Sequence, residues 1–244
     1  KYRGFKVKMK TGIFCHYLEE NNKNPIIEEE KDYPCKYINP KKNKGYLFKV
    51  TYYKTKINID IFHVLTDGNG GTIFFREIIY TYLEICHTNE LKPENRQIRK
   101  IEEYNTEDSY MKNYNKKAKS NTTLQRAYQL KGNKIKLGAI SAIHQIINLE
   151  QLKEESKKYD STITQYLTAV LIYAIYNENY IKNKGKKPIK VCIPVNLKKY
   201  FPSKTMSNFF SYITLTAQIR KGKMDTFEEI IEFVKKEFKD MLAE

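Results

Sequence analysis

The sequence contains no tryptophan, few arginines and no long apolar run. No stretch approaches the roughly 18 apolar residues that a membrane-spanning helix needs, so a spanning helix is excluded. The four cysteines, at positions 15, 35, 86 and 192, form no Cys-x-x-Cys pair. This spacing argues against a zinc site and favours a reducing, cytoplasmic location. Cys86 and Cys192 lie in apolar segments, and we expect both to be buried.

Charge of one sign dominates, because 44 basic residues against 28 acidic ones give a net charge of +16. A nucleic-acid or anionic-surface binder is therefore one function class to consider. However, only six of the basic residues are arginine, whose forked guanidinium suits base and phosphate recognition best. The lysines are spread along the chain, with short clusters in polar stretches at 41–44, 116–119 and 184–187. We favour a solvated lysine-rich surface over a nucleic-acid site.

Apolar residues make up 41% of the chain, which is enough for one large domain or two small ones. Apolar spacing of two residues predicts strands, and spacing of three to four predicts helices. Strands are expected at 4–10, 45–53, 56–63, 137–149, 188–195 and 208–218, and helices at 72–87, 149–159, 162–174 and from 226 to the end. The second and third strands are expected to form a hairpin. The mixture predicts an α/β fold.

Two polar stretches, 20–44 and 88–134, are expected to be connections. The second, with one short helix near 109–117, is the best candidate for a subdomain boundary. The final helix carries an apolar stripe but has no following element that could cover it. The chain also opens at Lys1 without a methionine. We therefore expect a fragment whose last domain continues beyond Glu244.

The most informative stretch is Ile-Asn-Ile-Asp-Ile-Phe-His-Val-Leu-Thr-Asp-Gly at 57–68. Alternate residues of a strand share a face, so His63 is expected to end a core-facing isoleucine row just before a glycine-rich turn. A neutral imidazole at a strand end is well placed as a general base. Asp67 is expected to orient that histidine or to brace the loop, and Gly68 to permit a positive φ or a close backbone approach.

Plainer interpretations of the same residues remain open. A lone histidine on an apolar face is commonly a core residue, and Asp-Gly after a strand is commonly a turn. Metal ligation by His63 and Asp67 would need a helix there, which the strand pattern disfavours. The segment 69–72 is rich in glycine but lacks the lysine of a phosphate-binding loop.

The pattern His-x-x-x-Asp-Gly at 63–68, followed by an amphipathic helix, resembles the signature of the chloramphenicol-acetyltransferase-like superfamily. This group includes acyltransferases dependent on coenzyme A (CoA), condensation domains and alcohol acetyltransferases. Its members commonly carry a second histidine where this chain has Phe62. The stretch Ile-Pro-Val-Asn-Leu-Lys-Lys-Tyr-Phe-Pro-Ser at 193–203, with Asn-Phe-Phe at 208–210, is similar to a segment of bacterial alcohol-acetyltransferase-like members. Lys198 stands where those members commonly have arginine.

The resemblance implies a mixed sheet in two layers with helices and two related subdomains, the second incomplete. Residues 1–125 would form the first subdomain and 126–244 the start of the second. Family members are about twice as long, and many carry an Asp-Phe-Gly-Trp-Gly-type segment that this chain lacks. The cleft between the subdomains is therefore expected to be incomplete.

By resemblance, His63 would be the general base of an acyl transfer from acyl-CoA, such as acetyl-CoA, to an alcohol, amine or thiol. CoA would be a substrate, and no permanently bound cofactor or metal is expected. Asp67 and Gly68 would be structural, and Asn208 or a hydroxyl such as Ser207 or Ser211 would stabilise the oxyanion. The alternative is a non-catalytic fragment or binding module of the same fold. Self-association is left open.

Overall fold

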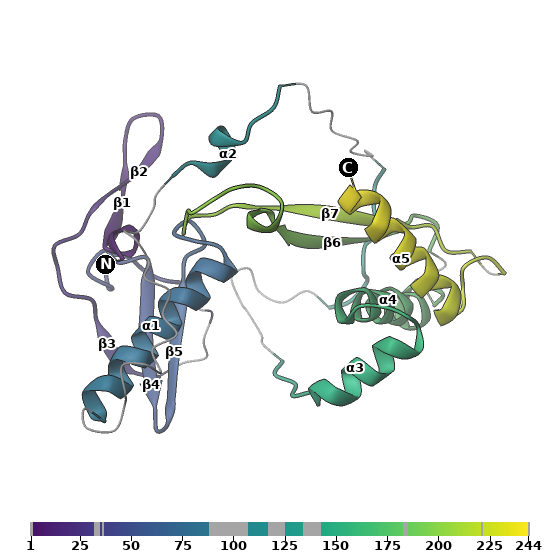
Figure 1. The fold of residues 1–244 in the computed structure, drawn as a ribbon, viewed down its shortest axis with the longest axis horizontal. Coiled ribbons are helices and arrows are strands. Elements are labelled where there is room, and N and C mark those ends of the chain that lie inside the picture. The colour runs from purple at the N-terminus through teal and green to yellow at the C-terminus, as the bar shows by residue number, and fades with distance from the viewer. Residues whose placement is uncertain are drawn as a thin grey trace. The chain divides into compact units, whose positions relative to one another are not determined.

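The structure is a computed structural model that describes residues 2–31, 35, 37–87, 107–116, 125–133, 143–182, 185–220 and 222–243 (Figure 1). The chain divides into two compact units. The first unit comprises residues 1–116 together with 196–210, and the second comprises 117–195 together with 211–244. The subdomain boundary expected after residue 125 remains a prediction. The contacts add that the segment 196–210 packs with the first unit, although it follows much of the second in sequence.

The described residues of the first unit form five strands and one long helix. Its elements are η1 (Arg3–Phe5), β1 (Val7–Thr11), β2 (His16–Glu20), β3 (Ile27–Glu29), β4 (Phe48–Tyr53), β5 (Lys56–Ile61), α1 (Gly68–Cys86), α2 (Ser109–Lys112) and η4 (Leu197–Lys199). β1 and β2 form an antiparallel pair, and β4 lies between parallel β3 and antiparallel β5. The predicted hairpin is thus confirmed. Lys54 turns it with a φ of 51°.

Helix α1 covers the sheet of β3, β4 and β5, as Figure 1 shows. Phe74 of the helix stacks on Phe5 with ring centroids 3.8 Å apart, and its edge meets Phe48 of β4. The isoleucines of β5 pack against this cluster. Because the helix follows β5 directly and packs back onto its sheet, the turn between them is held at the edge of a rigid core.

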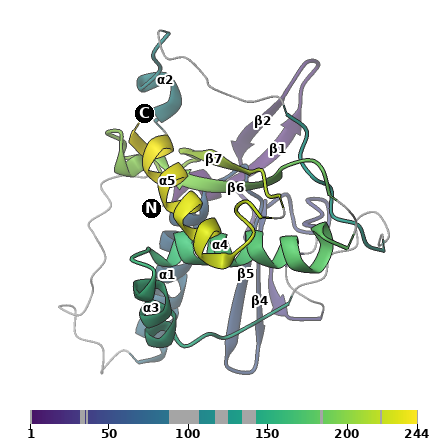
Figure 2. The same ribbon diagram turned by 90° about the vertical axis from the view of Figure 1, so that its right-hand side faces the viewer.

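The second unit contains α3 (Leu149–Lys158), α4 (Ile163–Ile175), the π-helical turn η3 (Tyr176–Tyr180), β6 (Ile189–Asn196), β7 (Phe210–Ala217) and α5 (Phe227–Ala243). The two strands pair with each other. Helices α4 and α5 contact each other, as Figure 2 shows, and pack on the strand pair. The core combines Ile172 of α4, Leu215 of β7, and Ile230 and Val234 of α5, all fully buried.

Capping side chains fix the residue at which several helices begin. Thr162 and Gln165 form a capping box at the start of α4, and Glu229 and Thr226 exchange the same pair of bonds before α5. Helix α1 begins four residues earlier than predicted. The side chain of Asp67 accepts the Gly70 N–H and caps it there, so the glycines form its first turn.

Several expectations about elements were wrong. Strands β2 and β3 lie in or beside the stretch expected to be a connection, because pairing with β1 and β4 recruits their polar sequences. Of the strand expected at 137–149, residues 143–148 have no regular structure, and 134–142 lie outside the described residues. Most of the expected linker 88–134 also lies outside them.

Two burial expectations were wrong as well. Cys86 and Cys192 are exposed, because each lies on the open side of its element. The apolar stripe of the last helix, which was expected to lack a cover, packs on α4 and β7. Among the described residues, no helix is both long and apolar enough to cross a membrane.

Candidate active site

His63 lies in the turn between β5 and α1, two residues beyond the last strand residue, Ile61. The Phe62 N–H still bonds to the Leu47 carbonyl at 2.8 Å, and the turn then closes through a bond from the Leu65 N–H to the Phe62 carbonyl at 3.0 Å. Leu65 is buried and anchors the turn in the core. The chain therefore leaves the strand before His63. The expectation that His63 ends a core-facing row was wrong: its side chain is exposed.

The imidazole of His63 lines a pocket of about 280 Å³ in the first unit. One wall is formed by Ile59 and Ile61 of β5, and another by the first turns of α1, including Phe75. His63 and Asp67 are the titratable side chains in the wall. The His63 ring also lies beside Phe210, with centroids 5.5 Å apart. The His63 imidazole therefore borders a hollow whose walls are largely apolar.

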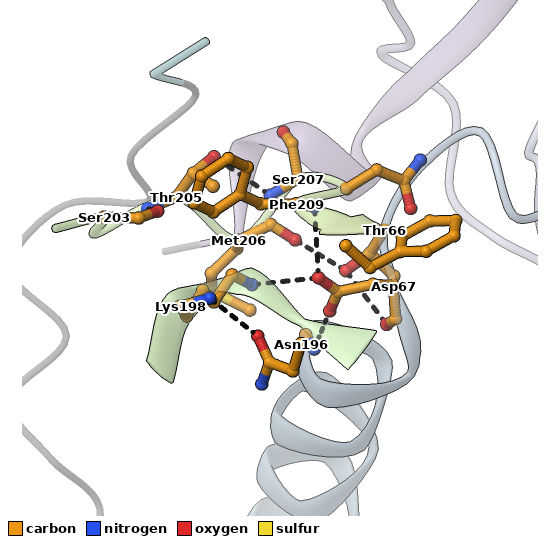
Figure 3. A network of polar contacts seen from close by, with 12 residues as sticks. Thr66, Asp67, Asn196, Lys198, Ser203, Thr205, Met206, Ser207 and Phe209 are labelled. Atoms are coloured by element: carbon orange, nitrogen blue, oxygen red, sulfur yellow. Dashed lines mark hydrogen bonds and ion pairs between the residues drawn. The ribbon is translucent and has the colours of Figure 1, made fainter. Parts of the chain in front are cut away.

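Asp67 is the centre of a buried polar network (Figure 3). Its Oδ1 accepts the Gly70 N–H at 2.9 Å. Its Oδ2 accepts the Lys198 Nζ at 3.1 Å and the Phe209 N–H at 3.3 Å. The side chains of Asp67 and Lys198 are only 8% and 13% exposed. The carboxylate thus ties the start of α1 to the segment 196–210.

These bonds decide between the two roles expected of Asp67. Within the described part of the chain it makes no hydrogen bond to His63 and is fully engaged in bracing. The cation that bracing requires is Lys198, whose own N–H is held by the Asn196 side chain at 3.0 Å. Its ammonium meets Asp67 across 131 positions of sequence.

Two further bonds attach the turn to the same segment. The Thr66 hydroxyl donates to the Met206 carbonyl at 2.5 Å. The Asn208 Nδ2 donates to the carbonyl of His63 itself at 2.7 Å. The Asn208 Oδ1 is buried and has no hydrogen-bond partner within the described ranges. Asn208 therefore holds the main chain that carries the imidazole.

The remaining predicted residues are Ser207, Ser211 and Gly68. Ser207 lies in the segment 196–210, with its N–H on the Thr205 hydroxyl at 3.2 Å. Ser211 falls in the second unit. Gly68 is exposed, and a Cβ there would meet no atom within 4 Å, so the close approach expected of it is absent. The glycine that does permit a close approach is Gly70.

Sequence reasoning missed Gly70, Thr66 and Met206. The run Asp-Gly-Asn-Gly-Gly signals that some glycine is needed, but it does not say which one. Thr66 and Met206 carry no signal, because one contributes a common hydroxyl and the other a main-chain carbonyl.

We expect Gly70→Ala to lower the free energy of unfolding of the first unit by about 1–3 kcal/mol. A Cβ at Gly70 would lie 2.6 Å from the Met206 carbonyl oxygen and would also collide with the Thr66 hydroxyl, so the docked segment must move. Urea unfolding would measure the loss. Gly68→Ala is the matched control and should be neutral or slightly stabilising, because alanine favours helices. Equal losses in the two variants would contradict this account.

Comparison with known proteins places this geometry in a family context. The model of a family described as alcohol acetyltransferase matches residues 108–244, which include Lys198 and Asn208. No curated protein matches the chain.

Solved structures match nearly the whole chain. Polyketide synthase associated protein 5 from Mycobacterium tuberculosis is similar at a TM-score of 0.62 and 12% identity, over 99% of this chain and 63% of that one. The first condensation domain of the CDA synthetase gives 0.50 and 10%, over 99% and 62%. The X-domain from teicoplanin biosynthesis gives 0.51 and 10%, over 99% and 60%. The chain therefore spans less than two thirds of each of these structures, and it has the predicted chloramphenicol-acetyltransferase-like α/β fold.

Proposed function

Because the chain belongs to the alcohol acetyltransferase family, we propose that the protein transfers an acyl group from a thioester to an alcohol, with His63 as the general base. CoA is the proposed carrier of the acyl group and acetyl-CoA the first donor to test. Amines and thiols are further acceptors, because the same base would activate them.

One observation carries this proposal: the buried pair of Asp67 and Lys198 fixes the His63 turn to the segment 196–210. The family match includes Lys198 but begins after His63, so sequence comparison alone leaves the histidine unassigned. The ion pair, together with the bond from Asn208 to the His63 carbonyl, links the histidine physically to the matched region. A catalytic base needs such fixed positioning, because misplacement by about 1 Å costs on the order of 100-fold in rate.

The proposed reaction proceeds in two steps without a covalent enzyme intermediate. The His63 imidazole accepts the proton of the acceptor hydroxyl. At the same time the hydroxyl oxygen attacks the thioester carbonyl, which gives a tetrahedral oxyanion. The C–S bond then breaks, the ester forms, and the thiolate of CoA takes the proton from the imidazolium. The protein supplies no electrons and needs no further reactant.

Asn208 is the proposed oxyanion donor. One N–H of its amide is used on the His63 carbonyl, which leaves the other available. A donor held in place by a second bond needs little reorganisation during the reaction, which is the condition for strong stabilisation of an oxyanion.

Acceptor-dependent thiol release from acetyl-CoA and longer acyl-CoAs tests the proposal. The chain as it stands and versions extended at each end would be incubated with a panel of alcohols and amines. Thiol release that rises with acceptor concentration, with the matching ester or amide found by mass spectrometry, is the expected result. Folded, extended protein that gives no product with any donor would overturn the CoA-dependent function and favour the non-catalytic binding module.

A further inference from the structure

A second pocket, of about 720 Å³, lies wholly within the second unit. Its wall is formed by the π-helical turn η3, the segment 185–186, the residues after β7 and Asp225 ahead of α5. This volume is within the range of pockets that bind small organic ligands, about 300–1,000 Å³. No residue that lines this pocket takes part in the proposed acyl-transfer steps.

The backbone around the pocket has an uncommon conformation. The Ile181 N–H bonds to the Tyr176 carbonyl at 3.0 Å, five residues back, which is the hydrogen bond of a π-helix. Such turns are rare and are frequently found at functional sites. Gly185 then passes directly against the ring of Tyr180, where a Cβ would collide, and its N–H bonds to the Tyr180 carbonyl at 2.9 Å.

The pocket wall carries several hydrogen-bond donors for which the described residues provide no partner. Lys186 and Arg220 are both exposed, and neither has an acidic group within 4 Å in the described ranges. The hydroxyls of Tyr176 and Tyr180 also have no hydrogen-bond partner among the described residues. Burial raises the pKa of both tyrosines, so both hydroxyls stay protonated at neutral pH. Asp225 also lines the wall, and its Oδ2 accepts the Gly222 N–H at 2.8 Å.

A donor-rich wall with two cations fits an anion that has several oxygens, and a phosphate monoester has three. The same wall also offers apolar surface, with Ile181 half exposed and Ile219 buried behind it. A ligand with both a phosphate and a flat apolar body would use both parts. The arrangement is compact enough for one mononucleotide.

We propose that this pocket binds a phosphorylated nucleoside, with its phosphate on Arg220 and Lys186 and its base against Ile181 and the edges of the two tyrosines. The ligand is either a free nucleotide or the adenosine 3′,5′-bisphosphate end of a larger molecule such as CoA. The free-nucleotide source is independent of the proposed acyl transfer, whereas the CoA source rests on it. The measurement is binding in both cases, so its outcome is separable from activity.

Isothermal titration calorimetry on the full chain tests it, with AMP, adenosine 3′,5′-bisphosphate, adenosine and inorganic phosphate as probes. We expect saturable one-site binding of at least one of the two nucleotides, weakened at least tenfold by Arg220→Ala. Binding of the bisphosphate alone identifies the CoA-like source, and equal binding of AMP identifies a free nucleotide. Lys157→Ala, which removes an exposed lysine of α3, is the matched control and should bind within twofold of the parent.

Thermal unfolding would establish whether each variant is folded. If Arg220→Ala does not fold, Lys186→Gln gives an independent measurement. Lys186→Gln should weaken binding of the same nucleotide while preserving the fold. Absence of saturable nucleotide binding would overturn the proposal. Nucleotide binding that Arg220→Ala and Lys186→Gln both leave unchanged would also overturn it, and so would binding of inorganic phosphate as tight as that of either nucleotide.

Discussion

His63→Ala is expected to lower kcat/KM for acyl transfer by roughly 10²–10⁴, the usual contribution of a positioned general base. The side chain is exposed in a turn, so its removal should leave the thermal unfolding temperature nearly unchanged. The parent protein should show kcat/KM rising with pH on its acidic side, because a base acts only when unprotonated. The variant should lose that rise.

His144→Ala is the matched control, because His144 is also exposed but lies in the second unit. It should retain full activity. Equal activity in His63→Ala and in the parent protein would exclude His63 from the mechanism, but it would leave the family assignment intact.

Asp67→Ala is expected to lower the free energy of unfolding of the first unit by about 3–5 kcal/mol. The change leaves the ammonium of Lys198 buried without its partner and also removes the cap of α1 and the acceptor of the Phe209 N–H. Hydrogen exchange at the Gly70 and Phe209 amides would measure it locally, and urea unfolding would measure it globally. Both amides should lose protection together.

Two controls separate burial from mere proximity. Lys153 and Glu150 form a shorter contact of 2.9 Å, but both side chains are well exposed, so Glu150→Ala should cost no more than about 0.5 kcal/mol. Lys198→Arg keeps the cation and should retain most of the stability. A loss below about 1 kcal/mol in Asp67→Ala would contradict a structural role for the pair.

The fold could be predicted where local signals were strong. The hairpin of β4 and β5 and the apolar stripe of α5 both depend on residues a few positions apart. The prediction failed where pairing partners decided the outcome. β2 and β3 have polar sequences and become strands because β1 and β4 lie beside them.

The candidate site was predicted in composition but not in geometry. His63 and Asp67 were found from one short motif, and the resemblance added Lys198 and Asn208 from a distant segment. The sequence analysis predicted that His63 faces the core, because it continued the alternation of inward- and outward-facing strand residues past Ile61, the last paired residue. The strand ends where its ladder ends, and that depends on the neighbouring strand.

The sequence by itself determined the α/β class and the elements with strong local signals, and it supplied the residues proposed to carry the chemistry, because periodicity and a local motif depend on neighbouring positions. Only the tertiary structure decided that Lys198 neutralises Asp67, that Asn208 holds the His63 carbonyl and that Gly70 is the glycine without room for a side chain. These contacts join residues more than 130 positions apart, apart from the Thr66 hydroxyl beside Gly70. Such contacts depend on how the segment 196–210 packs against the start of α1, which no local pattern encodes.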